Sequence, residues 1–210
     1  HSDILFRRRG MVEADQKIKI LEIDDDSIKQ VGQYPWPRST YKKLIDKLVK
    51  DGVSVVALDV LLIDPSRPEE DRELIDVTRR HSDRVVHAVM SDNKILNQME
   101  FVYPFPALRK VTKHLGQVTQ PIKDNDGSFR VEPLVIGSAP RWRPAEWATD
   151  PGAMPTLGLA ALALHEKKDF RSYLKLPGLA DGGAVARLTF SGEEVKRMGV
   201  QTLPDGTEEE

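Results

Sequence analysis

The stretch Val53-Ser54-Val55-Val56-Ala57-Leu58-Asp59-Val60 decides the fold class of this 210-residue chain. It is a nearly continuous run of apolar and β-branched residues, and Asp59 carries its single charge. Such a run is typical of a strand in a parallel sheet whose two faces are both covered by helices. We therefore expect residues 53–60 to form a buried strand.

The residues before this stretch predict a helix and a further strand. Ser39 can cap a helix that ends at Gly52, and its apolar positions recur with helical spacing at Tyr41, Leu44, Ile45, Leu48 and Val49. The isoleucine-rich residues 17–24 predict a strand that ends in the carboxylates of residues 24–26. Strand, helix and strand form a βαβ unit, for which a right-handed crossover is strongly preferred.

The rest of the chain continues this alternation. Helices are predicted at residues 68–82, 105–114 and 156–168, and strands at residues 84–90, 129–136 and 184–190, with a turn at residues 123–128. These patterns predict a single α/β domain with a largely parallel, mixed sheet and helices on both faces.

Composition and charge mark out the parts of the chain and narrow its functions. We expect a lead-in at residues 1–16, a folded domain at residues 17–203 and a disordered tail at residues 204–210; the proline- and tryptophan-rich residues 137–155 read as a surface insertion. The net charge of −2 disfavours binding of nucleic acid, and the absence of cysteine excludes disulfides, thiol nucleophiles and thiolate metal sites.

Several motifs in a fixed order carry a resemblance to a known family. They are Ser2–Arg9, Ile18–Ser27, Gly32-Gln33-Tyr34-Pro35-Trp36-Pro37-Arg38, Val55–Val60 followed by Asp71, Asp126–Arg130 and Pro155–Ala160. The chain resembles a CHASE domain of the second type, an extracellular sensor module of bacterial cyclases, histidine kinases and related receptors. The likeness covers residues 2–168; it is weaker in the tail, and residues 137–155 depart from it.

The resemblance implies a place and a role for the domain. No apolar run reaches the length of about 20 residues that crosses a bilayer, so the membrane helices that the family has on both sides would lie outside this sequence, with residues 1–16 leading in from the first. The resemblance further implies a homodimer that faces the periplasm or extracellular space, senses a small-molecule or envelope stimulus and drives an intracellular cyclase or kinase. It implies no cofactor and no catalysis in this domain.

Five charged residues form the main candidate site: Asp24, Asp26, Arg38, Asp59 and Asp71. The C-terminal ends of adjacent parallel strands meet where open α/β sheets bind ligands, and carboxylates converging there could hold a hard cation. The same residues could instead cap helices and pair with the arginine. We favour this structural interpretation.

Pro35, Trp36 and Pro37 form a candidate structural motif beside this cluster. Prolines fix φ on either side of the tryptophan, which suggests an indole that packs inward and holds the turn. The five histidines show no metal-ligand spacing, and no nucleophile or phosphate-binding motif is present.

Three functions remain open at this point. The first is signal reception by an extracytoplasmic sensory domain that is not itself an enzyme. The second is a metal-dependent α/β hydrolase that uses Asp24, Asp26 and Asp59. The third is a structural spacer that dimerises without binding a ligand.

Overall fold

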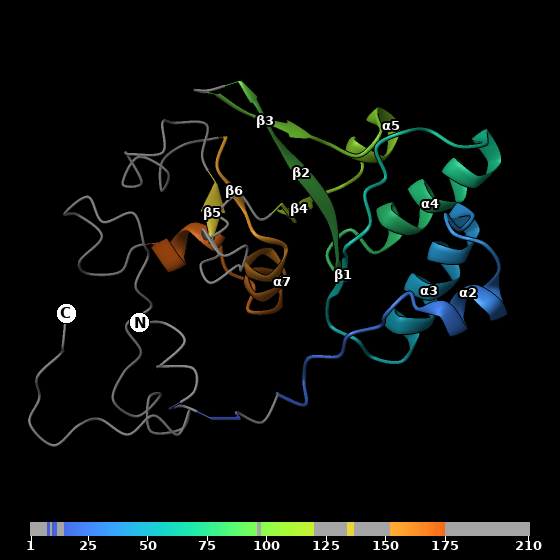
Figure 1. Cartoon of the computed structure of the whole chain (residues 1–210), viewed down its shortest axis with the longest axis horizontal. Helices are drawn as coiled ribbons and strands as arrows, with labels where there is room; N and C mark the ends of the chain where they lie inside the picture. Colours follow the sequence, from blue (N-terminus) through green and yellow to red (C-terminus); the bar gives the residue numbers. More distant parts are fainter. Residues whose placement is uncertain are drawn as a thin grey trace, which may run out of the picture.

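The protein has an α/β architecture with a mixed sheet at its centre (Figure 1). The computed structural model describes residues 8, 10–11, 15–95, 98–119, 134–136 and 152–174. Within this part, no helix is long and apolar enough to span a membrane. The predicted fold class is confirmed.

The main sheet is built around β2 (Val85–Ile95). β1 (Val56–Leu58) and β4 (His114–Gln117) both pair with β2 in parallel, and β3 (Gln98–Val102) pairs antiparallel with its second half. A second, two-stranded antiparallel sheet joins β5 (Val135–Ile136) to β6 (Met154–Pro155). A parallel bridge between Gln117 and Thr156 links the two sheets.

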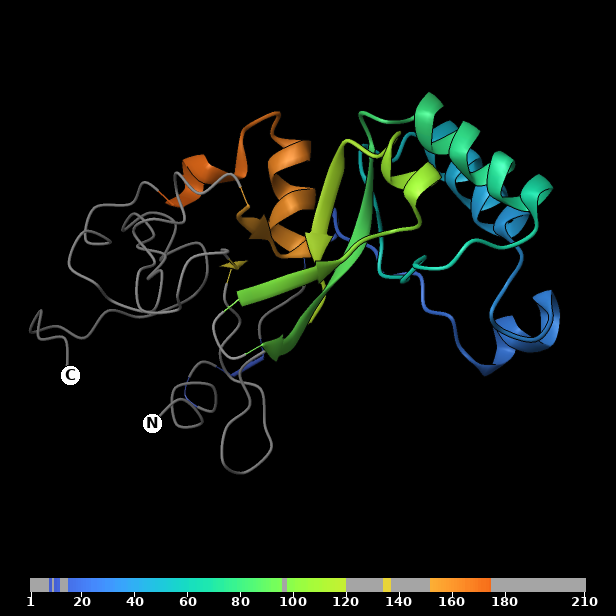
Figure 2. The same ribbon diagram turned by 90° about the horizontal axis from the view of Figure 1, so that it is seen from above.

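Helices cover opposite sides of the main sheet (Figure 2). α3 (Arg38–Lys50), α4 (Pro68–Arg80) and the short α5 (Pro106–Arg109) lie on one side, and α7 (Leu157–His165) lies on the other, in contact with β1, β2 and β4. α2 (Asp25–Val31) lies at the periphery, and a 3₁₀ turn, η1 (Phe170–Leu174), follows α7.

The main core fills the space between the sheet and the first group of helices. Tyr41 and Ile45 from α3, and Leu74 and Val77 from α4, pack against β1 and the start of β2. Each fully buried aliphatic side chain contributes about 1.5–3 kcal/mol. Tyr41, Ile45, Leu48 and Val49, four of the five apolar positions that predicted the buried face of α3, lie in this core or against it.

Two of the predicted strands differ from the structure. Residues 17–24 form no strand: the backbone has no ladder partner in the described part, and Ile18 and Ile20 are 73% and 88% exposed. The predicted strand 53–60 narrows to β1, where Ala57 is exposed between two buried neighbours. The prediction that both faces of this strand are covered is therefore wrong at its centre.

Three further predictions differ from the structure. Ser39 does not cap α3 but lies inside it, since the helix begins after Pro37. The backbone N–H of Ser39 donates to the carboxylate of Glu70 from α4, which supplies the cap instead. The predicted helix 105–114 is the single turn α5, and His114 instead starts β4 by pairing with Val86. The predicted loop 137–155 contains β6 at its end.

The other predicted helices and strands are observed with shifted bounds. The helix predicted at 68–82 is α4, the strand at 84–90 is the longer β2, the end of the strand at 129–136 is β5, and the helix at 156–168 is α7. The predicted turn 123–128, the strand 184–190, the tail 204–210 and residues 129–133 and 137–151 lie outside the described residues.

Candidate functional site

Arg38 and Asp71 are the two members of the predicted cluster that the structure brings together. Arg38 is the first residue of α3, and its Nε lies 3.7 Å from Oδ1 of Asp71 in the first turn of α4. Their side chains are only 14% and 11% exposed. Nη2 of Arg38 also donates to the backbone carbonyl of Asp64, 3.0 Å away. Arg38 therefore ties the start of α3 to α4 and to the loop before it.

Two neighbouring carboxylates complete this polar clasp, by which we mean Arg38, Ser39, Ser66, Glu70 and Asp71. Glu70 accepts from the backbone N–H of Ser39 at 2.7 Å and from its hydroxyl at 3.2 Å, and these bonds lower the pKa of Glu70. Asp71 Oδ2 accepts from the backbone N–H of Ser66 at 2.9 Å. The acids of α4 thus satisfy backbone donors of α3 and of the loop.

Sequence reasoning did not identify Glu70 or Ser66. The available signal was Pro68 followed by three acids, a pattern typical of a helix start. This pattern places carboxylates at the first turn of α4. It does not show that they cap a different helix, because that contact joins residues about thirty positions apart in the chain.

Asp24 and Asp26 make their contacts within α2. Asp24 is the N-cap of this helix and accepts from the backbone N–H and hydroxyl of Ser27 at 2.8 and 2.7 Å. The hydrogen bonds from Ser27 lower the pKa of Asp24. Asp26 is exposed and pairs with Lys29 at 2.9 Å.

Asp59 follows β1 directly and is exposed. Across the described residues, no group of three or more histidine, cysteine, aspartate or glutamate side chains is placed to hold a metal ion. The metal interpretation of the five-residue cluster therefore has no geometric support in this part of the chain: Asp24 caps α2, and Arg38 and Asp71 join α3, α4 and the loop before α4.

The segment Tyr34-Pro35-Trp36-Pro37 leads directly into this clasp. Trp36 Nε1 donates to the backbone carbonyl of Gly32 at 2.8 Å, and its half-buried ring packs against the main core. Tyr34 meets the indole edge-on, with ring centroids 6.4 Å apart. Pro35 and Pro37 flank the indole, and Pro37 immediately precedes α3. The segment positions Arg38 at the helix start.

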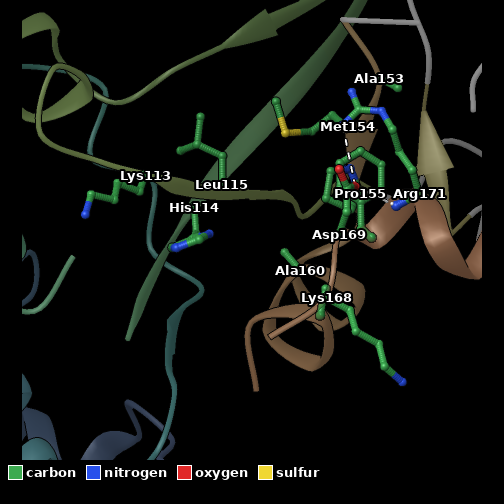
Figure 3. A pocket seen from close by; sticks show the side chains of 12 residues that line it. Lys113, His114, Leu115, Ala153, Met154, Pro155, Ala160, Lys168, Asp169 and Arg171 are labelled. Carbon is green, nitrogen blue, oxygen red and sulfur yellow. Dashed lines mark hydrogen bonds and ion pairs between the residues drawn. The ribbon is translucent and has the colours of Figure 1, made fainter. Parts of the chain in front are cut away.

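A separate cavity of about 360 Å³ lies on the α7 side of the sheet (Figure 3). Residues 113–115 at the start of β4 form one wall, and residues 153–155 around β6 form the other. Two alanines of α7, Ala160 and Ala163, and residues 168–171 after this helix complete its lining. We call this the β4–α7 cavity.

Close packing next to the cavity fixes the distance between its walls. A Cβ placed on Gly116 would lie 2.4 Å from Cα of Leu157, so β4 and the start of α7 meet at van der Waals distance there. Thr156 caps α7 by accepting from the backbone N–H of Leu159 at 3.2 Å. The cavity opens next to this contact, at His114 and Leu115.

The polar groups of the cavity are arranged around an apolar centre. In Figure 3, Leu115, Met154, Pro155 and Ala160 face the middle, while Lys113 and Lys168 extend outward at opposite ends. His114 is half-buried. Burial and the charge of Lys113 lower its pKa, and Asp83 opposes this shift. The neutral imidazole is therefore favoured over its charged form.

Sequence reasoning did not identify this cavity. Its walls come from residues 113–115, of which the first two were predicted as the end of helix 105–114, and from residues 153–155, which were predicted as part of the surface insertion 137–155. No local pattern shows that these segments lie side by side.

Comparison with known proteins identifies the family. The model of the CHASE2 domain family matches residues 1–204, and the chain therefore belongs to this family of extracellular sensory domains of signalling receptors. No match was found among curated proteins or among solved structures. The expected resemblance is confirmed.

Proposed function

We propose that this domain is the signal-input part of a membrane-anchored bacterial receptor. It receives a small-molecule or envelope stimulus outside the cytoplasm and passes it to an intracellular cyclase or histidine kinase. The observation that carries this proposal is the match of the CHASE2 domain over residues 1–204, since this family is sensory and extracellular.

The geometry of the acidic residues gives little support to a metal-dependent hydrolase. Asp24 is engaged by Ser27, Asp71 by Arg38 and the backbone of Ser66, and Glu70 by Ser39. A metal-dependent hydrolase would need several carboxylates that converge on one cation. Asp24 and Asp26 instead make their contacts inside α2, so the hydrolase alternative has the weaker support.

Transmission of the signal fits a homodimer with two arrangements. A stimulus shifts such an equilibrium only if it binds one arrangement more tightly than the other. A structural spacer would dimerise but show no ligand-dependent shift. The β4–α7 cavity, a concave site open to the surface, favours the receptor over the spacer, because a spacer needs no such site.

The location of the domain can be tested by labelling, because this chain contains no cysteine. Lys43 is exposed on α3 and suits a Lys43→Cys reporter in the full-length receptor with any other cysteines changed to serine. A membrane-impermeant maleimide should label it in intact spheroplasts. Ile45→Cys, two residues away and fully buried, is the matched control and should react only after unfolding.

Two results would count against the proposal. Labelling of Lys43→Cys only after lysis would place the domain in the cytoplasm. A full-length gene product without membrane helices around this segment would contradict the receptor as well.

A further inference from the structure

We propose that the β4–α7 cavity is the stimulus-binding site and that it takes an uncharged small molecule, a compact apolar body that carries one hydroxyl group. This inference rests on the proposed function and deepens it, because it gives the input domain a place and a chemical class for its stimulus. Three observations support it: the volume and apolar lining of the cavity, the pairing of the charges around it, and the position of His114.

The size of the cavity fits a small organic molecule. Its volume of about 360 Å³ lies near the lower end of the range of about 300–1,000 Å³ that is typical of ligand pockets. The volume arises from small side chains. Ala160 and Ala163 lie three positions apart on α7 and so share one face, and Ala153 belongs to the wall around β6. A leucine at either helical position would fill much of this space.

The lining that the body of a ligand would contact is mainly apolar. Met154 and Pro155 of β6 and Phe170 of η1 contribute aliphatic and aromatic surface, and Figure 3 shows the first two together with Ala160. Such surface binds an apolar body by removing it from water. Water itself finds few hydrogen-bonding partners there. The lining therefore favours an organic ligand.

The charged groups of the lining are paired or extend away from it. Nη1 of Arg171 lies 3.6 Å from Oδ1 of Asp169, and Lys168 pairs with Glu166 at 2.6 Å. In Figure 3, Lys113 and Lys168 extend outward at opposite ends of the cavity. A charged ligand would therefore leave water without gaining a free partner of opposite charge inside, which costs free energy. An uncharged ligand avoids this cost.

His114 presents its ring to the cavity. It lies two residues before Gly116 on β4, so the two residues share one face of the strand. Gly116 meets the start of α7 on that face, since a Cβ there would lie 2.4 Å from Cα of Leu157. The imidazole of His114 therefore points to the α7 side, where it is half-buried and lines the cavity.

The ring of His114 is suited to bind a hydroxyl group. Burial and the charge of Lys113 lower its pKa, against the effect of Asp83, and in the described part of the chain no hydrogen bond to the ring contributes to this shift. The neutral imidazole has one nitrogen that donates and one that accepts. A hydroxyl can accept from the first or donate to the second. An uncharged molecule with one hydroxyl therefore matches both the lining and this ring.

The inference can be tested with four probes that share a phenyl ring and one further carbon: benzyl alcohol, toluene, benzoate and benzylammonium. Each is titrated into the 210-residue chain by calorimetry up to about 3 mM, where a site with a dissociation constant of about 1 mM is mostly filled, with thermal unfolding as a second readout. We expect benzyl alcohol and toluene to bind saturably and to raise the unfolding temperature. We expect benzoate and benzylammonium to bind at least about tenfold more weakly than benzyl alcohol, since each would carry an unpaired charge out of water.

Variants of His114 connect the hydroxyl group to this ring. His114→Phe keeps a planar ring without its nitrogens, so it should weaken benzyl alcohol about fivefold, the equivalent of one ordinary hydrogen bond, and leave toluene unchanged. His114→Gln keeps a donor and an acceptor and should retain most of the affinity for benzyl alcohol. His81→Phe is the matched control, because His81 follows α4 and lies outside the lining.

Variants of α7 test the place of binding. Ala163→Leu should weaken benzyl alcohol and toluene alike by filling the cavity, and Ala160→Leu provides a second substitution on the same face if Ala163→Leu does not fold. Ala161→Leu is the matched control on the same helix, since Ala161 is not part of the lining, and it should leave both affinities unchanged. Circular dichroism checks that each variant is folded.

Three outcomes would overturn the inference. Binding of benzoate or benzylammonium as tight as that of benzyl alcohol would refute the uncharged ligand. An unchanged affinity of His114→Phe for benzyl alcohol would refute the assigned hydroxyl group. No binding of any probe at about 3 mM, or binding that a folded Ala163→Leu or Ala160→Leu leaves unchanged, would refute the site. Any of these results combined with labelling of Lys43→Cys in intact spheroplasts would leave the receptor function standing, so the two proposals can fail separately.

Discussion

Acid should destabilise this domain through one buried histidine. His87 lies on β2 with none of its surface exposed, and its Nε2 is 3.0 Å from the hydroxyl of Thr78 on α4, which is also buried. Burial disfavours the charged imidazolium and lowers the pKa of His87 from 6.5 to about 4. His87 is therefore neutral in the folded protein at neutral pH.

The size of the effect follows from the two pKa values. Below about pH 6.5 the unfolded chain takes up a proton at His87, whereas the folded protein takes it up only near pH 4. The free energy of unfolding therefore falls through this window, by about 1.4 kcal/mol per pH unit. At pH 5 the expected loss is about 2 kcal/mol relative to neutral pH.

The assay compares urea unfolding of the parent and a His87→Phe/Thr78→Val double variant at about pH 7.5 and about pH 5. The double variant replaces both hydrogen-bonding partners by apolar groups, so Thr78 is not left unpaired. The more acidic condition stays above the ordinary pKa of carboxyl groups, which keeps their titration small. The parent should lose about 2 kcal/mol more than the variant. Equal losses in the two proteins would refute the assigned role of His87.

Three further predictions concern the scaffold. Gly116→Ala should destabilise the domain by about 1–3 kcal/mol in urea unfolding, because the new Cβ meets Leu157. The control Gly158→Ala, which has open space around it, should not destabilise the domain, and equal effects of the two substitutions would contradict the close approach of β4 and α7. Arg38→Met should cost about 3 kcal/mol by leaving Asp71 buried without its cation, and Arg38→Met/Asp71→Leu should recover part of this loss; no recovery would argue against the pairing. Calorimetric titration with Ca²⁺ and with Mg²⁺ should give the same heats for the parent, Asp24→Asn and Asp59→Asn. A heat of binding that the parent shows and the two variants lack would support the metal interpretation.

Local patterns predicted the elements whose own residues determine them. α3 and α4 carry apolar residues at helical spacing, and both helices were found with bounds close to those predicted. The apolar run at residues 53–60 also contains a strand, β1, because Val56 and Leu58 of this run are buried in the core beneath the helices. In these segments the hydrophobic pattern and the tertiary packing agree.

Predictions failed where a distant partner decides the structure. Residues 17–24 have a strand-like composition, yet a strand exists only when a neighbouring strand accepts its hydrogen bonds, and alternation of side chains cannot supply that neighbour. The opposite holds for β4, whose four residues include a histidine, a glycine and a glutamine. These residues give no strand signal and are held in place by β2.

The candidate site shows the same division in its chemistry. The charged residues were the candidates for a site in the sequence. In the structure, Asp24 caps α2, and Arg38 and Asp71 hold the starts of α3 and α4 and the loop before α4. The β4–α7 cavity instead depends on two small side chains, those of Ala160 and Ala163, and on segments that come together only after folding.

In the sequence, the alanines of α7 favour a helix and do not indicate a cavity. They contribute to the cavity only through the space that their small side chains leave unfilled. That volume is set by the surrounding backbone, in particular by the contact at Gly116 that holds β4 against α7. The α3 and α4 side of the sheet thus carries the polar clasp, which is held by an ion pair and hydrogen bonds, and the α7 side carries the β4–α7 cavity. The clasp ties the start of α3 to α4 and to the loop before it, whereas the shape of the cavity depends on how β4, β6 and α7 pack against one another.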